Sequence, residues 1–356
     1  MMRSLTFLMC LCILATSALA SSGGHGGGGG NRGGSGLLEM GQPVERAIVS
    51  TTKVTPQELA LSREKLYAQA ILQLLANPGV ADLGRCTGNE GWFSAPCIPP
   101  VSEAAAKKQL DDIAASPATV KKRYALLIAN QDYRAPIPAL ETPKKDAEEI
   151  ARVLQSEYGY EVTTLKDASK RDIVKGLVKL AGTASAADSV VVLYAGHGYL
   201  VAKTGLGYWI PTDATPTAAE GWISNSDITK LLAAVPARQL ILISDSCYSG
   251  SLTKEKNLAD LSHVKRDALL KNRTVTAMSS GGNEPVSDEG KDGHSIFAWS
   301  LINTLKSGNT GAIGTSVWRK VRAEVTKAYP QQPQYGALPS AGHIEGGDYL
   351  FFSAKP

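Results

Sequence analysis

From Arg123 onward, short apolar runs alternate with stretches in which apolar residues recur every three or four positions. Runs of the first kind predict buried strands, and stretches of the second kind predict helices that pack by one face. Strands are predicted at 124–129, 160–165, 189–194, 208–210, 240–243, 273–278 and 348–352. Helices are predicted at 143–154, 169–180, 226–234, 295–305 and 316–328. The alternation indicates one α/β domain over residues 123–353, with a mainly parallel sheet flanked by helices.

The start of the chain has the pattern of a secretory signal peptide over residues 1–20. Arg3 supplies a positive start, an apolar stretch covers 5–14, and Ala18-Leu19-Ala20 is a small-residue cleavage site. A membrane anchor is the alternative, but the apolar run is shorter than the ~20 residues that a span needs. Residues 21–36 contain ten glycines and predict a flexible tether. We therefore expect an exported protein, periplasmic or secreted, without a membrane span.

Residues 37–122 predict a helical N-terminal extension. Thr55-Pro56-Gln57-Glu58 forms a capping box with proline at the first helical position, and Asn77-Pro78-Gly79 ends that helix. A further helix is predicted at 103–114. The segment is either a prodomain or docking element, or a helical extension packed on the main domain. We favour the extension, because no residue pattern here points to specific chemistry.

Composition limits the function classes. The 356 residues are 43% hydrophobic and 20% charged, which is sufficient for a globular core. The net charge is +4, without the clustered basic face that nucleic-acid binding usually requires. Three cysteines follow the predicted signal peptide: Cys86, Cys97 and Cys247. In an oxidising compartment Cys86 and Cys97 could form a disulfide across a short loop, which leaves Cys247 as the odd thiol.

Two predicted strands lead into reactive side chains. The strand at 189–194 leads to Gly196-His197-Gly198, and the strand at 240–243 leads to Asp245-Ser246-Cys247. Since neighbouring parallel strands end at the same edge of a sheet, an imidazole and a thiol would meet there if these strands are adjacent. A neutral histidine can take the proton of a cysteine thiol. Backbone N–H groups of Gly198 and Cys247 could then form an oxyanion hole.

Each of these residues alone has a simpler interpretation. A cysteine after an apolar run is more often buried and inert, and a glycine-flanked histidine is often an ordinary loop residue. The pairing of the two at strand ends favours a nucleophilic site. A zinc site is not expected, because His197 has no His, Cys or carboxylate nearby at ligand spacing. A thiol oxidoreductase is not expected either, because the chain has no Cys-x-x-Cys motif.

Tyr194-Ala195-Gly196-His197-Gly198 and Asp245-Ser246-Cys247-Tyr248-Ser249-Gly250 resemble the two catalytic motifs of the caspase-like cysteine peptidases. Asp245 before the cysteine resembles the metacaspase and paracaspase branch, including orthocaspase-like proteins. His197 and Cys247 are fifty positions apart, which is also similar to the interval in caspases. The resemblance extends over about 123–352. It implies a caspase-like three-layer sandwich and a cysteine endopeptidase, with His197 as general base and acid and Cys247 as nucleophile.

The resemblance also implies a specificity pocket that contains Asp146 and Asp245. Two carboxylates suit the side chain of Arg or Lys, so cleavage after Arg or Lys in protein or peptide substrates is expected. The alternative is that Asp146 complements its helix dipole and Asp245 caps a turn. The runner-up for the whole chain is a non-catalytic caspase-fold binding or scaffold module, against which the presence of both His197 and Cys247 argues.

Two regulatory features follow from the resemblance. Many metacaspases carry an acidic run after the histidine and require calcium, but residues 199–210 contain no Asp or Glu and only Asp213 follows. Calcium needs several oxygen ligands, so calcium dependence is doubtful. No other metal and no cofactor are expected. The segment 251–273 is either cut by the enzyme itself or a solvated charged helix at 261–270. Its basic residues are Lys254, Lys256, Lys265, Arg266, Lys271 and Arg273.

Overall fold

The computed structural model describes residues 101–201, 206–216, 221–246, 258, 261, 264–282, 290–307, 312–329 and 331–352. The predicted signal peptide, the glycine-rich tether and the helix that begins near residue 55 lie outside the described residues. So do Cys86, Cys97 and Cys247.

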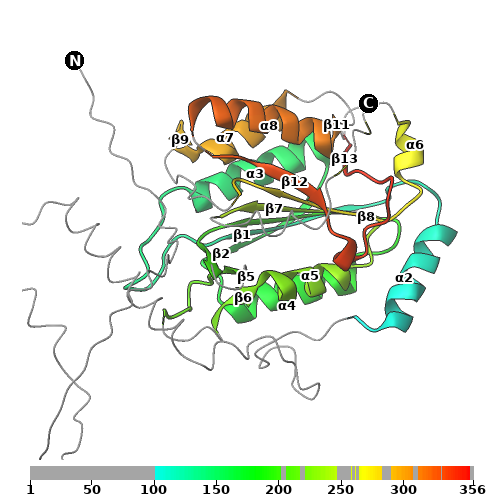
Figure 1. Ribbon diagram of the computed structural model, residues 1–356, viewed down its shortest axis with the longest axis horizontal. Coiled ribbons are helices and arrows are strands. Elements are labelled where there is room, and N and C mark those ends of the chain that lie inside the picture. Colours follow the sequence, from blue (N-terminus) through cyan, green and yellow to red (C-terminus); the bar gives the residue numbers. More distant parts are fainter. Residues whose placement is uncertain are drawn as a thin grey trace, which may run out of the picture.

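A six-stranded sheet in the order β12-β8-β7-β3-β1-β2 forms the centre of the domain (Figure 1). Its parallel strands are β1 (Arg123–Ala129), β2 (Glu161–Lys166), β3 (Ser189–Ala195), β7 (Gln239–Asp245) and β8 (Thr274–Ser279). The edge strand β12 (Gln334–Ala337) pairs antiparallel with β8. The prediction of a mainly parallel sheet is confirmed, whereas β12 was not predicted because its four residues lack a long apolar run.

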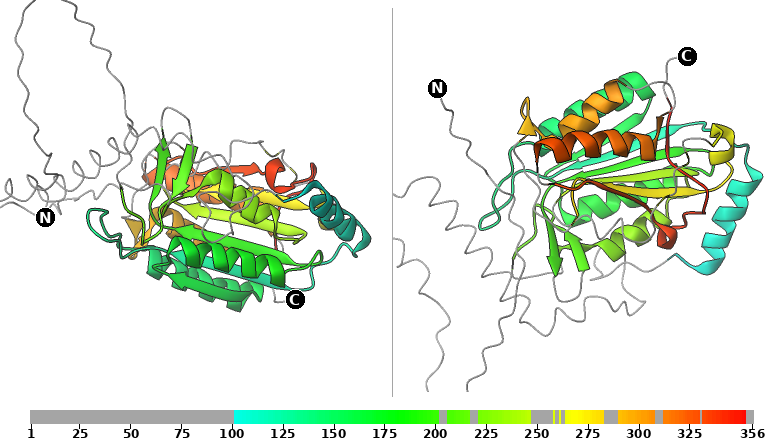
Figure 2. Two further views of the ribbon diagram at one scale, coloured as in Figure 1. Left: turned by 90° about the horizontal axis from the view of Figure 1, so that it is seen from below. Right: turned by 45° about the horizontal axis from the view of Figure 1, so that its top comes forward.

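Helices cover both faces of the sheet, which gives the three layers (Figures 1 and 2). On one face lie α3 (Pro143–Tyr158), α7 (Ile296–Lys306) and α8 (Gly314–Ala328); on the other lie α4 (Lys170–Thr183) and α5 (Asn225–Ala233). Successive strand residues alternate between the two apolar cores. The core under α3, α7 and α8 contains Leu127, Val191 and Ile241, and the core under α4 and α5 contains Leu126, Val190 and Leu240.

Short elements lie around the central sheet. A small antiparallel sheet of β4 (Gly198–Val201), β5 (Leu206–Trp209) and β6 (Ile223–Ser224) follows β3, and β9 (Gly290–Lys291) pairs with β10 (His294–Ser295) in a hairpin. The strand predicted at 348–352 is the two-residue β13 (Leu350–Phe351). It pairs with β11 (Ala312–Ile313) and does not join the central sheet.

The end of the sheet opposite the candidate site contacts α2 (Glu103–Ala115), which agrees with the helix predicted at 103–114 (Figure 1). Arg238, just before β7, is 1% exposed and donates to Ile113 O and Ser116 O at 2.6 and 2.9 Å. It also donates to Leu270 O at 2.6 Å, directly after the short helix α6 (Arg266–Leu269). One buried guanidinium therefore joins the carboxyl end of α2 to the end of α6. Helix α6 is shorter than the 261–270 helix considered from sequence.

Candidate active site

The strands that carry the candidate residues are adjacent and parallel. In the β3–β7 register Ala195 pairs with Asp245, the last residue of each strand, and the Gly196 N–H donates to Asp245 O at 3.2 Å. His197 follows two residues after Ala195, and Cys247 follows two residues after Asp245 in the sequence. The structure therefore brings the His197 strand end beside Asp245 and Ser246, while Cys247 itself lies outside the described residues.

His197 is buried and its ring is held on two sides. Its Nε2 atom lies 2.8 Å from the backbone carbonyl oxygen of Pro138, and its ring centroid lies 4.7 Å from that of Tyr133. A carbonyl oxygen can only accept, so Nε2 must carry the proton in this contact. In the neutral imidazole, the lone pair is then on Nδ1. The contact with Pro138 thus selects the tautomer in which Nδ1 can accept a proton.

Two tyrosines fix the backbone around His197. The His197 N–H donates to Tyr133 Oη at 2.9 Å, and Tyr133 Oη donates to Ile210 O at 3.0 Å. Tyr194 Oη donates to His197 O at 2.7 Å, while its ring stacks on Trp209. Both hydroxyls crowd Gly196, because a Cβ there would lie 2.7 Å from Tyr133 Oη and 2.9 Å from Tyr194 Oη. A side chain at position 196 would therefore clash with the two hydroxyls, so glycine is required there.

The backbone N–H of Gly198 is directed away from β5. His197 O accepts the Ile210 N–H at 3.0 Å, so this carbonyl points towards the strand that contains Trp209. In a planar trans peptide the C=O and the following N–H point in opposite directions. The Gly198 N–H, which belongs to the same peptide unit, consequently faces away from β5. This orientation is compatible with the oxyanion-hole role predicted for Gly198.

The loop that supplies the Pro138 carbonyl is anchored by Asp167, at the end of β2. Asp167 Oδ1 accepts the backbone N–H groups of Gln131 and Asp132 at 3.0 and 2.9 Å, and its other carboxylate oxygen pairs with Lys144. Burial raises the pKa of Asp167, but these hydrogen bonds and the Lys144 ammonium outweigh burial and leave the pKa below its usual value. Asp167 therefore holds the start of the loop as an ionised carboxylate.

The two predicted specificity acids converge on one residue, Ser295. Its hydroxyl donates to Asp245 Oδ2 at 2.6 Å, and its backbone N–H donates to Asp146 Oδ2 at 3.3 Å. The same hydroxyl accepts the Ala298 N–H and caps α7. Asp146, in the first turn of α3, is 1% exposed, whereas Asp245 is partly exposed. The structure thus places both acids at one side of the strand end, with Asp146 the more deeply buried.

His294 is a further member of this cluster that the sequence did not reveal. Its Nδ1 lies 2.6 Å from Asp146 Oδ1. It belongs to the β9–β10 hairpin, whose two turn residues Asp292 and Gly293 have φ of 58° and 77°. An Asp-Gly pair at positive φ is typical of a two-residue hairpin turn. That dipeptide was the available sequence signal for the hairpin, although it could not reveal the partner of His294.

Burial lowers the pKa of His294, and the nearby positive charge of Lys145 lowers it further. His294 is therefore neutral near pH 7, and its Nδ1–H donates to the carboxylate of Asp146.

Asp213, the acid that follows the segment 199–210, accepts the Lys170 N–H at 3.0 Å. Within the described ranges, no group of three His, Cys, Asp or Glu residues could hold a metal ion.

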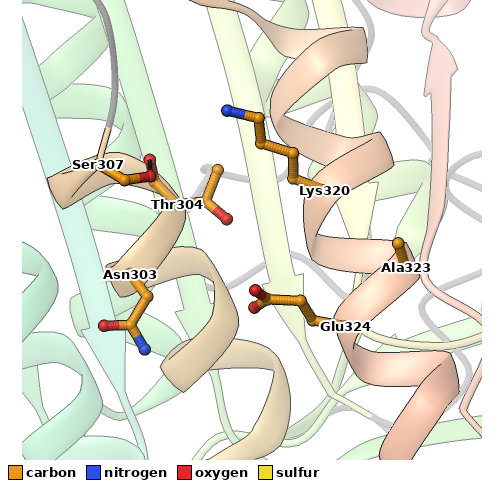
Figure 3. Close-up of a pocket in the computed structure, with 6 residues that line it drawn as sticks. All are labelled: Asn303, Thr304, Ser307, Lys320, Ala323 and Glu324. Atoms are coloured by element: carbon orange, nitrogen blue, oxygen red, sulfur yellow. Dashed lines mark hydrogen bonds between the residues drawn. The ribbon is translucent and has the colours of Figure 1, made fainter.

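A separate hollow of about 380 Å³ lies between α7 and α8 (Figure 3). Its lining is polar at several positions and includes Asn303, Thr304, Ser307, Lys320 and Glu324. Asn303 follows Ser295 by eight residues along α7, which corresponds to about 12 Å of helix. The hollow therefore lies towards the far end of α7 and contains none of the predicted site residues.

No helix in the described part of the chain is long and apolar enough to cross a membrane.

Comparisons with known proteins identify the domain. Among curated proteins, no sequence matches this chain. A solved Geobacter sulfurreducens protein matches with a TM-score of 0.47 and 17% identity, covering 64% of this chain and all of the other. Caspase-1 from Spodoptera frugiperda matches with a TM-score of 0.48 and 14% identity, covering 73% of this chain and 98% of the other. The family model for the caspase domain matches residues 122–340, more than half of the chain, and the chain therefore belongs to the caspase-domain family of cysteine peptidases.

Proposed function

We propose that this chain is an exported cysteine endopeptidase of the metacaspase and paracaspase branch, periplasmic or secreted, which cleaves after Arg or Lys. His197 and Cys247 form its catalytic dyad, without a metal or cofactor. The observation that carries the proposal is the register of β3 and β7, in which Ala195 pairs with Asp245. Each strand is followed two residues later by one member of the dyad. The contact between His197 Nε2 and Pro138 O supports the assignment of the base, because it leaves the lone pair on Nδ1.

In the first half of the reaction, Nδ1 of His197 takes the proton of the Cys247 thiol. The thiolate attacks the carbonyl carbon of the scissile peptide bond, and the oxyanion that forms accepts hydrogen bonds from the N–H groups of Gly198 and Cys247. When the tetrahedral intermediate collapses, the C–N bond breaks and the His197 imidazolium gives its proton to the leaving amine. The product is a thioester on Cys247.

In the second half, His197 takes a proton from water, and the resulting hydroxide attacks the thioester carbonyl. Collapse of this intermediate breaks the C–S bond, releases the carboxylic acid product and returns the proton to the Cys247 sulfur. Throughout the cycle, the Pro138 carbonyl accepts from Nε2–H and stabilises the imidazolium form of His197. The cycle needs no group beyond these residues and water.

The acids Asp146 and Asp245 give the preference for a basic residue before the cleaved bond. Asp245 is partly exposed and is held by the Ser295 hydroxyl at 2.6 Å, so it is the acid placed for direct contact with a guanidinium or ammonium. Asp146 is buried, so it adds negative charge to the pocket without direct contact with the substrate side chain. Replacement of Asp245 by Asn should reduce kcat/KM for basic substrates about tenfold to one hundredfold, which corresponds to about 1.5–3 kcal/mol.

A peptide-library cleavage profile of the chain that begins near Ser21 tests the proposal. The matched controls are the Cys247→Ala protein and labelling by an electrophilic peptide that ends in Arg, located by mass spectrometry. Cleavage after Arg and Lys that disappears in Cys247→Ala, together with a label on Cys247, is expected. An unlabelled, inactive protein would favour the non-catalytic binding or scaffold module, and N-terminal sequencing of exported material would check removal of the signal peptide.

A further inference from the structure

Asp146 is an unusual residue for a substrate-binding acid, because it is almost fully buried and both of its oxygens accept hydrogen bonds. Oδ1 contacts His294 Nδ1 at 2.6 Å and Oδ2 accepts the Ser295 N–H at 3.3 Å. The side chain of His294 is 12% exposed and that of Asp146 is 2% exposed, so His294 is the more accessible member of the pair. A titratable group is therefore in direct contact with the buried specificity acid.

The hairpin holds His294 in this position through several contacts. Lys145, next to Asp146 on α3, donates to the Asp292 carbonyl at 2.9 Å. The Asp292 carboxylate accepts the Trp299 indole N–H at 2.9 Å, and Lys291 lies over the Trp299 ring at 4.3 Å from its centroid. The turn, the start of α3 and α7 are thus joined, which holds the backbone that carries His294 beside Asp146.

Charges on the packed elements surround His294. On α3 these are Lys145, Asp146 and Glu149, on α7 Lys306, and within the hairpin Lys291 and Asp292. Across Ser295 lies Asp245. Glu149 stays ionised, because hydrogen bonds from Arg152 and Lys306 lower its pKa to about 2. Histidine is the side chain whose ordinary pKa lies between pH 5 and 8, so His294 is the group in this set suited to change charge there.

We propose that His294 is a specificity-determining residue of the site, which sets the negative charge that Asp146 contributes to recognition of a basic side chain. This role rests on the proposed cleavage after Arg or Lys. When His294 is neutral, it donates a hydrogen bond and Asp146 keeps its full charge. When His294 is protonated, the pair with Asp146 is neutral and Asp245 is left as the charged acid of the site.

The direction of the effect follows from this charge balance. Acidification protonates His294, cancels the charge of Asp146 and weakens the attraction for Arg relative to an uncharged side chain of similar length. The substrate guanidinium stays charged at every pH used. Because the dyad acts on both substrates, its titration cancels in the ratio of their kcat/KM values. The ratio therefore reports the charge of the pocket.

The test measures kcat/KM for matched peptides with Arg or citrulline before the cleaved bond, from about pH 8 to pH 5, above the ordinary carboxyl range. In the wild type, the Arg-to-citrulline ratio should fall about tenfold below pH 6.5. In His294→Gln, whose amide can still donate to Asp146 but does not titrate, the ratio should stay at its neutral-pH value throughout. In Asp146→Asn the ratio should already be low at pH 8, and any further fall should occur at lower pH than in the wild type, because His294 then titrates at lower pH. His343→Gln is the matched control, because His343 Nδ1 accepts the distant Val275 N–H, and it should behave as the wild type.

A measurement without turnover complements the kinetics. In Cys247→Ala protein, the NMR signal of His294, assigned by its loss in His294→Gln, should titrate below pH 6.5 and report the Nδ1–H tautomer. Asp146→Asn in the same background should shift this titration to lower pH, because it removes the adjacent negative charge.

The outcomes separate two kinds of failure. No preference for Arg at any pH in the wild type contradicts the proposed function and the role of His294 with it. A preference for Arg that is constant with pH, or that still falls in His294→Gln, contradicts the role of His294 alone. A His294 titration that is unchanged in Asp146→Asn contradicts the pairing on which that role depends.

Discussion

His197 Nε2 and the Pro138 carbonyl oxygen lie 2.8 Å apart, although the two residues are 59 positions apart in the chain. This contact orients the imidazole and places its proton on Nε2. The orientation of the His197 ring therefore also depends on the loop between β1 and α3, which Asp167 anchors. The orientation of His197, the proposed general base, is therefore set by backbone groups as well as by side chains.

The proposed His197–Cys247 dyad predicts a strongly non-additive mutational pattern. His197→Ala and Cys247→Ala should each reduce kcat by about a thousandfold or more, and the double variant should lose little further activity, because the two residues act as one unit. Single-turnover and steady-state rates of the three proteins test this. Near wild-type activity in either single variant would contradict the assignment of both residues.

Tyr133→Phe should impair the enzyme while retaining the ring that contacts His197. The change removes the hydroxyl that accepts the His197 N–H and donates to Ile210 O. A cost of about 1–3 kcal/mol in the free energy of unfolding and a loss of about tenfold in kcat are expected. Tyr158→Phe is the matched control, because its buried hydroxyl donates to Leu305 O between α3 and α7. Similar destabilisation without a change in kcat is expected there, and equal losses of kcat in both variants would show that Tyr133 acts through stability alone.

Much of the fold was predictable from the sequence because the central strands are buried on both faces. Val190, Val191, Leu240 and Ile241 are fully buried, so each strand is a continuous apolar run, and each run ends where the polar site residues begin. The adjacency of β3 and β7 was a condition of the Cys/His interpretation, and the structure shows that the two strands pair. The positions of His197 and Asp245 at neighbouring strand ends agree with that reasoning.

The remaining contacts had no sequence signal of this kind. A backbone carbonyl such as that of Pro138 is present in every residue, so the residue type does not identify it as a partner of His197. His294 and Asp146 lie 148 residues apart, and no periodic pattern relates them. The strand β12 is short and contains Gly336, so it gives neither a long apolar run nor a clear alternation. Tertiary packing, which local pattern does not determine, fixes all three.

Gly196→Ala should inactivate the protein through crowding of the two tyrosine hydroxyls. The added methyl would lie 2.7 Å from Tyr133 Oη and 2.9 Å from Tyr194 Oη, closer than real contacts allow. Displacement of either ring breaks a hydrogen bond to His197, so a loss of about one hundredfold in kcat/KM is expected. Gly182→Ala, in α4, has no neighbour within 4 Å of the new methyl and should stabilise the protein by about 0.5–1 kcal/mol. Thermal unfolding and kcat/KM of both variants test the contrast, which a fully active Gly196→Ala protein would contradict.

Asp167→Asn should reveal a pH-dependent contribution to stability. The folded-state pKa of Asp167 lies below its ordinary 3.8, so its stabilisation is present above that value and is lost as the pH falls through the folded-state pKa. The difference in free energy of unfolding between wild type and variant should be constant near pH 5–7 and shrink below about pH 3.8. Asp111→Asn, which removes an exposed pair with Lys107, should leave the free energy of unfolding nearly unchanged. Denaturant titrations at several pH values test this, and a difference that persists unchanged in acid would contradict the ionised role of Asp167.

Self-processing, if it occurs in the segment after the dyad cysteine, should be restricted by burial. Lys265, Arg266 and Lys271 are exposed, whereas Arg273 is 0% exposed and donates to Ala237 O at 2.8 Å. Arg273 cannot enter a second active site while β8 is intact, so cleavage should follow exposed basic residues and spare Arg273.

The fragments should also remain associated after the cut. Leu269 is buried, and Arg238 binds the carbonyl of Leu270, so the chain beyond α6 stays attached to β7. Mass spectrometry of the active protein beside Cys247→Ala should find new ends at exposed Lys or Arg residues in the active protein alone. Size-exclusion chromatography should then recover both fragments together. An intact chain with full activity would show that cleavage is not required, and a fragment ending at Arg273 would contradict the protection inferred from its burial.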